Sequence, residues 1–199
     1  QGRIGVMGGT FDPPHNGHFH IATEVASAKQ LDQVIFVPAS QPWQKSGYSD
    51  AEDRLAMTAL GAARDPRFRV SRIEIERAGP TYTIDTIAEL LEQFPGAELF
   101  LILGADAASN LGTWHRANEL ARYNVQIIAV PRPGFDVAML ETRKQKLPFE
   151  VIEVPPVNVS STEVRAAVQA GRSIEGLVPP EVAAYIKRHH LYKDGPVPR

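Results

Sequence analysis

The sequence predicts an α/β fold, a Rossmann-like doubly wound parallel sheet with a small helical part at its C-terminal end. Three observations lead to this prediction. Short, continuously apolar runs recur along the 199 residues, as expected of strands that are buried on both faces. Segments with helical periodicity separate these runs, which favours parallel strands joined by crossover helices. Two glycines follow the first run, at the end of a strand where such sheets bind their ligands.

The strands are predicted from short apolar runs that end at turn-forming residues. Glycines end the first run, Pro38 ends the second and Pro131 ends the fifth. The alternating pattern of residues 73–76 indicates a further, short edge strand. The six principal strands are expected at residues 4–7, 34–37, 68–70, 99–103, 125–130 and 149–154.

The helices are predicted from apolar positions at helical spacing and from signals at their ends. Ser49 to Glu52 is typical of a cap before the second helix, and the polar segment from Ala39 to Ser49 is expected to be a mobile loop. Helices are expected at about 17–29, 51–63, 82–94, 161–170 and 180–189. We expect a single domain over residues 1–192, with a C-terminal helical subregion at 160–192 and a disordered tail at 193–199.

Composition limits the classes of protein to which the chain can belong. Hydrophobic residues make up 43% and charged residues 22%, as in a globular protein with a real core. The formal net charge of −2 gives no global basic field, so we expect no nucleic-acid partner. The chain has no cysteine and no apolar run near the roughly 18 residues of a membrane span. We expect a cytoplasmic protein that does not bind membranes. The sequence leaves open whether the protein forms a homo-oligomer.

The segment from Gly8 to His18 predicts a phosphate site at the end of the first strand. Gly8 and Gly9 allow the backbone to turn sharply and to approach a ligand closely. The helix that begins near Gly17 offers free N–H groups and a positive potential to an anion. His15 and His18 are three residues apart and can share a face of that helix.

Two other interpretations of this segment stay open. It can be a helix-capping loop whose histidines bind nothing. It can also be a metal site, although no H-E-x-x-H pattern accompanies it; the ligands would be Asp12, His15, His18 and His20. The segment is neither a P-loop nor a G-x-G-x-x-G dinucleotide motif.

A second segment, from Val159 to Arg165, places hydroxyls at the start of a predicted helix. Hydroxyls and amides at a helix start can bind anions, and the guanidinium of Arg165 adds a fixed fork of donors for phosphate oxygens. Taken alone, the segment fits an ordinary helix cap with a solvated arginine better. Its hydroxyl residues are Ser160, Ser161 and Thr162.

Together, the two segments resemble the nucleotidylyltransferase superfamily. Residues Gly9 to His18 match its G-x-F-x-P-x-H-x-G-H signature, and residues 159–165 are similar to its I-S-S-T-x-x-R motif, with Val159 in place of Ile. The resemblance covers nearly the whole chain. It implies the nucleotidylyltransferase fold and an ATP molecule whose triphosphate lies where both segments meet. The implied ATP-binding residues are Gly8, Gly9, Thr10, Phe11, His15, His18, Ser160, Ser161, Thr162 and Arg165.

Two further segments indicate the acceptor. The G-x-D at Gly104 to Asp106, followed by Trp114, resembles the pyridine-mononucleotide adenylyltransferases, and residues 80–86 are similar to the P-x-Y-T-x-D-T of bacterial nicotinate enzymes. The resemblance implies that Trp114 stacks on the pyridine and that the amides of Thr83 and His115 hold the nicotinate carboxylate. Asp106 would accept hydrogen bonds from a ribose hydroxyl. From the residues alone, a core position is the better interpretation of Trp114, and helix capping is an alternative role for Asp106. Many relatives have Tyr in place of His115.

The resemblance thus implies transfer of an adenylyl group from ATP to nicotinate mononucleotide, giving nicotinate adenine dinucleotide and pyrophosphate in NAD biosynthesis. The expected catalytic residues are His15, His18, Arg165 and Lys45, the last in a loop where Gln44 replaces a histidine of many relatives. Mg²⁺ is the expected cofactor, held mainly by phosphates and not by dedicated protein ligands. Nicotinamide mononucleotide or phosphopantetheine as acceptor, a non-catalytic nucleotide sensor and a metallohydrolase are the alternatives.

Overall fold

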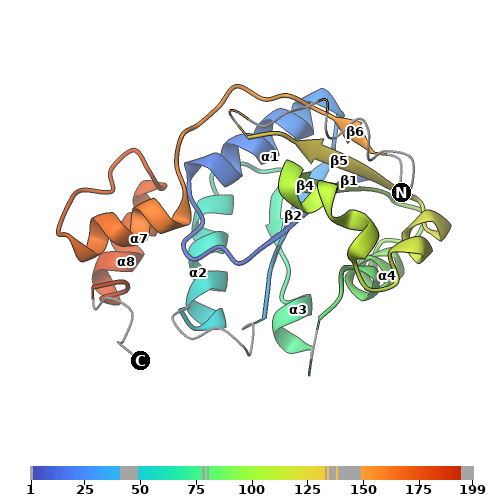
Figure 1. Cartoon of the computed structure of the whole chain (residues 1–199). Coiled ribbons are helices and arrows are strands. Elements are labelled where there is room, and N and C mark those ends of the chain that lie inside the picture. Colours follow the sequence, from blue (N-terminus) through green and yellow to red (C-terminus); the bar gives the residue numbers. More distant parts are fainter. Residues whose placement is uncertain are drawn as a thin grey trace. The chain divides into compact units, whose positions relative to one another are not determined.

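The computed structural model describes residues 2–40, 49–77, 79, 81–132, 134, 138 and 149–193, and it confirms the predicted α/β fold (Figure 1). In this part of the chain, six strands form one sheet in the order β3-β2-β1-β4-β5-β6. β4 runs parallel to β1 and β5, and β6 runs parallel to β5. The strands are β1 (Arg3–Gly9), β2 (Gln33–Pro38), β3 (Phe68–Val70), β4 (Glu98–Gly104), β5 (Val125–Val130) and β6 (Glu150–Val151).

The first phosphate segment and the segment that contains Asp106 follow neighbouring strands of the sheet. The strand order reverses between β1 and β4, which defines the switch point of a doubly wound sheet. The segment Gly8 to His18 continues from β1, and the segment containing Asp106 continues from β4. The central strands are continuously apolar because both of their faces are buried, as residues 34–37 of β2 show.

The helices lie close to their predicted bounds, with three short additions after β4. The additions are α5 (Ala105–Ser109) and the 3₁₀ segments η1 (Leu111–Thr113) and η2 (Ala117–Arg122). No helix in the described ranges is long and apolar enough to cross a membrane. The other helices are α1 (Asn16–Ala28), α2 (Ala51–Ala62), α3 (Ile73–Glu76), α4 (Thr83–Gln93), α7 (Ser161–Gln169) and α8 (Pro180–Arg188).

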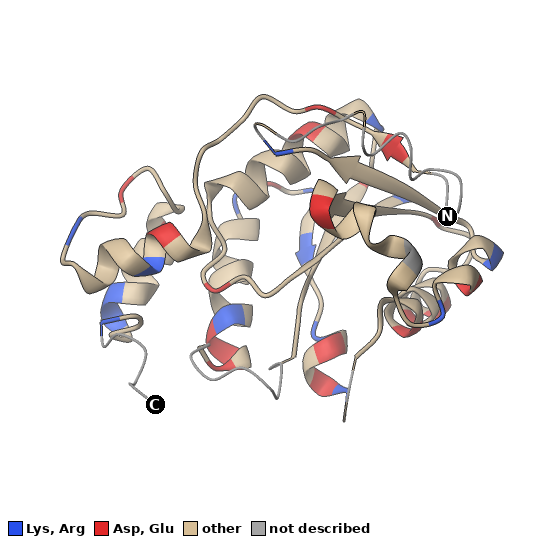
Figure 2. Cartoon of the chain, viewed as in Figure 1, with Lys and Arg blue, Asp and Glu red and all other residues tan. Residues whose placement is uncertain are grey.

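The edge strand predicted at residues 73–76 is wrong, because these residues form helix α3. At its start, the Ile73 N–H donates to Ser71 Oγ at 3.2 Å, and Arg72 pairs with Glu76 one turn on, at 3.0 Å. Arg72 also pairs with Glu52 of α2, and Figure 2 shows acidic residues on both helices. A four-residue alternation is too short to distinguish a strand from one helical turn.

The chain divides into two compact units. Unit 1 comprises Gln1–Gly8, Ile21–Ile35 and Ala78–Pro156, and unit 2 comprises Gly9–His20, Phe36–Arg77 and Val157–Arg199. A single domain over residues 1–192 stays a prediction. Within the expected tail at 193–199, only Lys193 belongs to the described residues.

The predicted C-terminal helical part belongs to unit 2, where α7 and α8 pack together and against α2 (Figure 1). Their shared core is apolar and buried, and each such side chain contributes roughly 1.5–3 kcal/mol when it leaves water. It consists of Met57, Val164, Val178, Val182 and Ile186. This packing fixes the position of the start of α7, which carries the second predicted motif.

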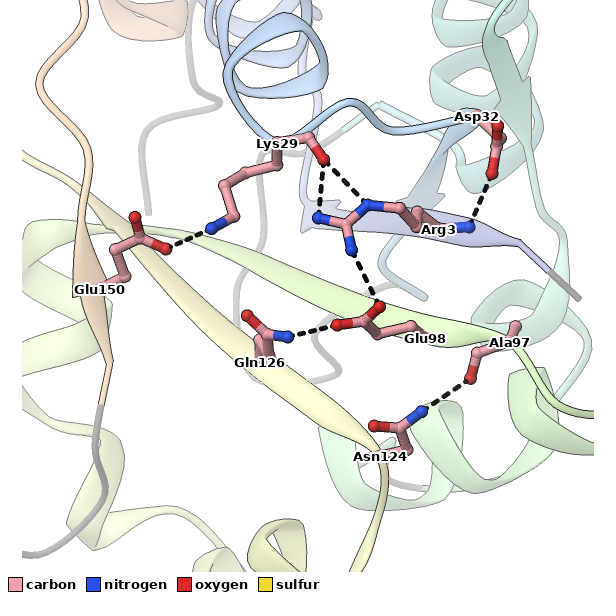
Figure 3. Close-up of polar contacts among 8 residues, drawn as sticks. All are labelled: Arg3, Lys29, Asp32, Ala97, Glu98, Asn124, Gln126 and Glu150. Carbon is pink, nitrogen blue, oxygen red and sulfur yellow. Dashed lines mark hydrogen bonds and ion pairs between the residues drawn. The ribbon is translucent and has the colours of Figure 1, made fainter.

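In unit 1, a polar cluster occupies the amino ends of the strands, opposite the ends that continue into the predicted site (Figure 3). Arg3 pairs with Glu98 at 2.9 Å, linking the first residues of β1 and β4. Lys29 pairs with Glu150 of β6 at 2.7 Å. Such partly exposed pairs contribute about 0–1 kcal/mol each to stability, so this cluster has a modest structural role.

Candidate active site

The segment after β1 is anchored in unit 2 by Phe11. This residue has a left-handed backbone conformation with φ of 53°, and its buried ring lies 5.8 Å from Phe36 and 5.0 Å from His18, measured between ring centroids. A Cβ on Gly9 would lie 3.1 Å from the Phe11 ring, so glycine leaves room for the turn. Because the ring is part of the core, a contact between Phe11 and ATP would have to use its backbone.

His15 and His18 stack on each other at the start of α1, with ring centroids 3.7 Å apart. Two backbone amides orient the rings. The Gly17 N–H donates to His15 Nδ1 at 3.1 Å, and the His15 N–H donates to His18 Nδ1 at 3.0 Å. A ring nitrogen that accepts a hydrogen bond does not carry the proton, so each neutral ring is protonated at Nε2. Both imidazoles therefore offer an Nε2–H donor.

Gly17 leaves the space that the His15 ring occupies at the start of α1. A Cβ at this position would lie 2.9 Å from both Cε1 and Nδ1 of His15, closer than real Cβ contacts allow. The His15 ring can cover the start of α1 only because residue 17 has no side chain. The prediction that the two histidines share one face is confirmed.

The surroundings of the two histidines keep both rings uncharged. Burial lowers the pKa of His15 to about 4. Burial, together with the neighbouring His15, lowers the pKa of His18 well below its ordinary value. Near pH 7 the pair is therefore a set of neutral, directed hydrogen-bond donors.

The second predicted segment lies directly on the first within unit 2. Ser161 Oγ donates to the carbonyl of Pro13 at 2.8 Å, and Arg165 Nη1 donates to the carbonyl of Asp12 at 2.8 Å. Thr162 Oγ1 accepts from Arg165 Nη2 at 3.3 Å. The structure thus brings the two motifs together, as the sequence resemblance implies.

The hydroxyls of the second motif also have local partners. Ser160 is the N-cap of α7, and its Oγ accepts from the Glu163 N–H at 3.0 Å. The interpretation as a helix cap is therefore correct for the Ser160 oxygen, while the Ser161 hydroxyl links the two motifs. Contact of these hydroxyls with phosphates stays a prediction.

Sequence reasoning missed Arg54, which ties three loop ends together. Its side chain is fully buried in α2 and donates to the carbonyls of Thr10, Ala39 and Ser49 at 2.9, 2.7 and 3.1 Å. A usable signal exists in the sequence, because Arg54 shares the buried face of the helix with Met57. A charged side chain on the apolar face of a helix needs hydrogen-bond partners that compensate for its burial, so its position predicts such partners.

Sequence reasoning also missed the role of Asp12, which it considered only as a metal ligand. Its buried carboxylate accepts from the Tyr192 hydroxyl at 2.5 Å and from the Ser49 N–H at 3.1 Å. Asp12 and Tyr192 are 180 positions apart, so no local pattern could reveal this bond.

In unit 1, the predicted nicotinate residues gather at the start of α4. The His115 ring stacks on Tyr82, with centroids 4.0 Å apart, and Arg116 pairs with Asp85 at 3.2 Å. Thr83 is the first residue of α4, so its N–H has no acceptor within the helix. The free N–H groups of the helix start favour a carboxylate at this place, while the Arg116 cation is already paired with Asp85 and Glu119.

Two further predicted residues of unit 1 can be placed. Trp114 is partly exposed, and both its interpretation as a core tryptophan and its stacking on a pyridine stay predictions. Asp106 lies in α5 and pairs with Arg132, which follows β5. The N-cap of α5 is Gly104 and makes no side-chain capping bond, so the alternative of Asp106 as a helix cap is wrong.

The remaining predictions concern Lys45 and metals. Lys45 and Gln44 lie outside the described residues, as does most of the expected loop from Ala39 to Ser49. Within the described ranges, no three His, Cys, Asp or Glu side chains gather into a set that could hold a metal ion.

Comparisons with known proteins agree with this geometry. The cytidylyltransferase-like family matches residues 6–167. A probable nicotinate-nucleotide adenylyltransferase of Leifsonia xyli subsp. xyli is 47% identical over 96% of this chain and 94% of its own length. One of Clavibacter michiganensis subsp. michiganensis is 49% identical over the same shares of the two chains.

Among solved structures, the nicotinic acid mononucleotide adenylyltransferase of Plasmodium falciparum complexed with NaAD has a TM-score of 0.78 at 18% identity. It covers 96% of this chain and 98% of its own, and at this identity the likeness concerns the fold. The chain therefore belongs to the cytidylyltransferase-like family and, within it, to the nicotinate-nucleotide adenylyltransferases.

Proposed function

We propose that this chain transfers an adenylyl group from ATP to nicotinate mononucleotide, giving nicotinate adenine dinucleotide and pyrophosphate in NAD biosynthesis. The observation that carries the proposal is the pair of Nε2–H donors on His15 and His18, fixed by backbone amides beside Arg165 in unit 2. The relatives at 47–49% identity support the choice of reaction.

The reaction needs no nucleophile from the protein, because the acceptor already carries one. An oxygen of its 5′-phosphate attacks the α-phosphorus of ATP in line, one phosphorus–oxygen bond forms, and the bond to the β-phosphate oxygen breaks. Pyrophosphate leaves with the electron pair. Catalysis therefore depends on positioning the two phosphates and on stabilising the charge that develops between them.

The ATP side of this reaction is assigned to residues of unit 2 and to Gly8. His18 donates from Nε2 to an α-phosphoryl oxygen, while His15 and Arg165 hold the β- and γ-phosphates. The backbone around Gly9 offers N–H groups at the same end of the sheet, and the helix start of α1 adds positive potential. The further ATP contacts are assigned to Gly8, Thr10, the Phe11 backbone, Ser160, Ser161 and Thr162, with Lys45 as an additional phosphate contact.

Mg²⁺ fits this site as an ion carried by ATP. The described residues provide no three-ligand protein cage, and the Asp12 carboxylate already accepts two hydrogen bonds. Mg²⁺ prefers to keep water and phosphate oxygens as ligands, and when bound it would neutralise phosphate charge. The contacts assigned to His15, His18 and Arg165 go to phosphate oxygens and not to the ion.

The acceptor side is assigned to unit 1. The amides of Thr83 and His115 hold the nicotinate carboxylate, Trp114 stacks on the pyridine and Asp106 accepts from a ribose hydroxyl. Backbone N–H donors at a helix start favour an anion over a neutral carboxamide, so nicotinate mononucleotide is the preferred acceptor. Asp106 pairs with Arg132 in this structure, so a ribose hydroxyl would have to replace Arg132 as the partner of the carboxylate.

An acceptor panel tests the reaction. Purified protein is given ATP, Mg²⁺ and one of nicotinate mononucleotide, nicotinamide mononucleotide or phosphopantetheine, and pyrophosphate release is measured. The highest kcat/KM is expected for nicotinate mononucleotide. Equal or faster turnover of either other acceptor contradicts the proposed specificity, and ATP binding without turnover of any acceptor identifies a nucleotide sensor. A cytoplasmic location and a homo-oligomer stay predictions.

The role of His18 is tested by His18→Asn. The Asn amide oxygen can still accept from the His15 N–H, but the donor at Nε2 is lost. We expect kcat to fall about 10²–10³-fold, as for removal of one donor to a developing charge. His20→Asn, on the same helix but outside the motif, is the matched control and should retain wild-type turnover. Near-normal kcat for His18→Asn would show that His18 does not stabilise the transferred group.

A further inference from the structure

We propose that Tyr192 is a positioning residue for the ATP site: its hydroxyl holds the Asp12 carboxylate and so fixes the loop that carries His15 and His18. This inference rests on the proposed function, since it concerns the same site. Tyr192 belongs to the turn after α8, and its hydroxyl donates to Asp12, with Ser49 and the Arg165 cation also close by.

Asp12 accepts hydrogen bonds from three donors in distant parts of unit 2, and a fourth donor binds the carbonyl that follows it. Its carboxylate is 2% exposed and accepts from Tyr192 at 2.5 Å and from the Ser49 N–H at 3.1 Å. Its main-chain carbonyl accepts from Arg165, and the next carbonyl accepts from Ser161, both at 2.8 Å. A buried carboxylate needs such donors, and losing one leaves its charge under-solvated.

Tyr192 is held in place for this contact. The Leu191 N–H donates to the Ile186 carbonyl at 3.1 Å, and Leu191 packs on the core shared by α2, α7 and α8. Tyr192 has φ of 62°, a left-handed conformation that an L-residue adopts only when its surroundings require it. Burial and the Asp12 charge raise the pKa of Tyr192 well above its ordinary value, so the hydroxyl keeps its proton and donates.

The contact matters for ATP because Asp12 precedes His15 by three residues in one turn of chain. The His15 backbone N–H orients the His18 ring, so a movement of this loop redirects both Nε2–H donors together. Misplacement of a catalytic group by about 1 Å can cost roughly 100-fold in rate. The end of the chain therefore acts on the phosphate site through Asp12.

Tyr192→Phe removes only the hydroxyl and tests the proposal. We expect kcat/KM for ATP to fall roughly 10-fold or more, while KM for nicotinate mononucleotide changes by less than about twofold. Calorimetry with α,β-methylene ATP should show weaker binding in the same proportion. The matched control is Tyr185→Phe, which loses a similar bond, from its hydroxyl to Asp53 at 2.6 Å, elsewhere in unit 2. It should keep wild-type kinetics.

The proposal is overturned if both variants lose thermal stability alike and neither changes the ATP parameters, because Tyr192 would then only anchor the chain end. A double-mutant cycle with Asp12→Ala, which removes the acceptor, supplies a second measurement. If Tyr192 acts through Asp12, the double variant is no worse toward ATP than Asp12→Ala alone, whereas additive losses contradict the proposal.

Two further outcomes are distinguishable. If Tyr192→Phe does not fold, Asp12→Ala, which removes the acceptor of the same bond, carries the test, and it must show the same loss confined to ATP. If the wild type binds α,β-methylene ATP but turns over no acceptor, the proposed reaction fails while the binding comparison between Tyr192→Phe and Tyr185→Phe still decides the role of Tyr192.

Discussion

The stability of the protein should fall as the pH drops from 6.5 towards 4, because the folded state resists protonation of His15. In the unfolded chain the imidazole has a pKa near 6.5, whereas burial lowers the pKa of His15 to about 4 in the folded protein. Between these values the unfolded state binds more protons, so the free energy of unfolding decreases as the pH falls. The difference between the two pKa values corresponds to about 3 kcal/mol.

The variant His15→Asn isolates this contribution. Its amide oxygen can accept from the Gly17 N–H in place of Nδ1, but it does not titrate. Urea unfolding is measured for both proteins at about pH 7 and about pH 4.5, with the linear dependence on denaturant used to obtain the free energy. Carboxylate protonation affects both proteins alike and cancels in the comparison. The wild type should lose about 2–3 kcal/mol more than His15→Asn over this interval.

Two results would refute the reasoning. Equal losses of stability in the two proteins would mean that His15 is as easily protonated in the folded state as in the unfolded one. An NMR titration of the His15 ring with its midpoint near 6.5 would say the same directly. Long-range ¹⁵N–¹H correlation spectra provide the check on tautomer, and a proton found on Nδ1 of either histidine would contradict the hydrogen bonds from Gly17 and His15.

Two glycine substitutions test the close packing of unit 2. Gly17→Ala should displace the His15 ring, since its Cβ would lie 2.9 Å from that ring, and we expect kcat to fall by about 10-fold or more with little change in the acceptor KM. Gly61→Ala should lower the free energy of unfolding by about 1–3 kcal/mol, because its Cβ would overlap the Phe19 ring. Gly104→Ala, where a Cβ meets nothing within 4 Å, is the stability control for Gly61→Ala, and an equal loss of stability there would contradict the steric explanation.

The fold could be predicted because its strands differ sharply in composition from everything around them. A strand buried on both faces must be continuously apolar, as residues 99–103 of β4 and residues 34–37 of β2 are. Short elements lack such a requirement. Residues 73–76 alternate like a strand but form α3, since one ion pair and one hydroxyl suffice to stabilise a single turn.

The motifs could also be predicted, but not the groups that hold them. The glycines and histidines around residues 9–18 are adjacent in sequence, so their density is visible there. Arg54 and Tyr192 reach the same loop from 44 and 180 positions away, and their partners are backbone carbonyls or a single carboxylate. Which oxygen receives which donor depends on packing between α2, α7 and α8, and that packing is not encoded in any local spacing.

Because the pKa values of His15 and His18 are low, the two histidines act in unit 2 as oriented neutral donors and Arg165 supplies the positive charge. If His15 and His18 were charged, they would attract ATP and pyrophosphate about equally, which would strengthen binding of the ground state and of the product. Neutral Nε2–H donors interact most strongly where charge develops, provided that their direction is fixed before the substrate arrives. The backbone amides of Gly17 and His15 fix it. Fixed positive charge is left to Arg165, which itself is held on the Asp12 carbonyl. The proposed chemistry therefore requires the rings to be uncharged and oriented. Burial keeps them uncharged, and the hydrogen bonds from the Gly17 and His15 amides orient them.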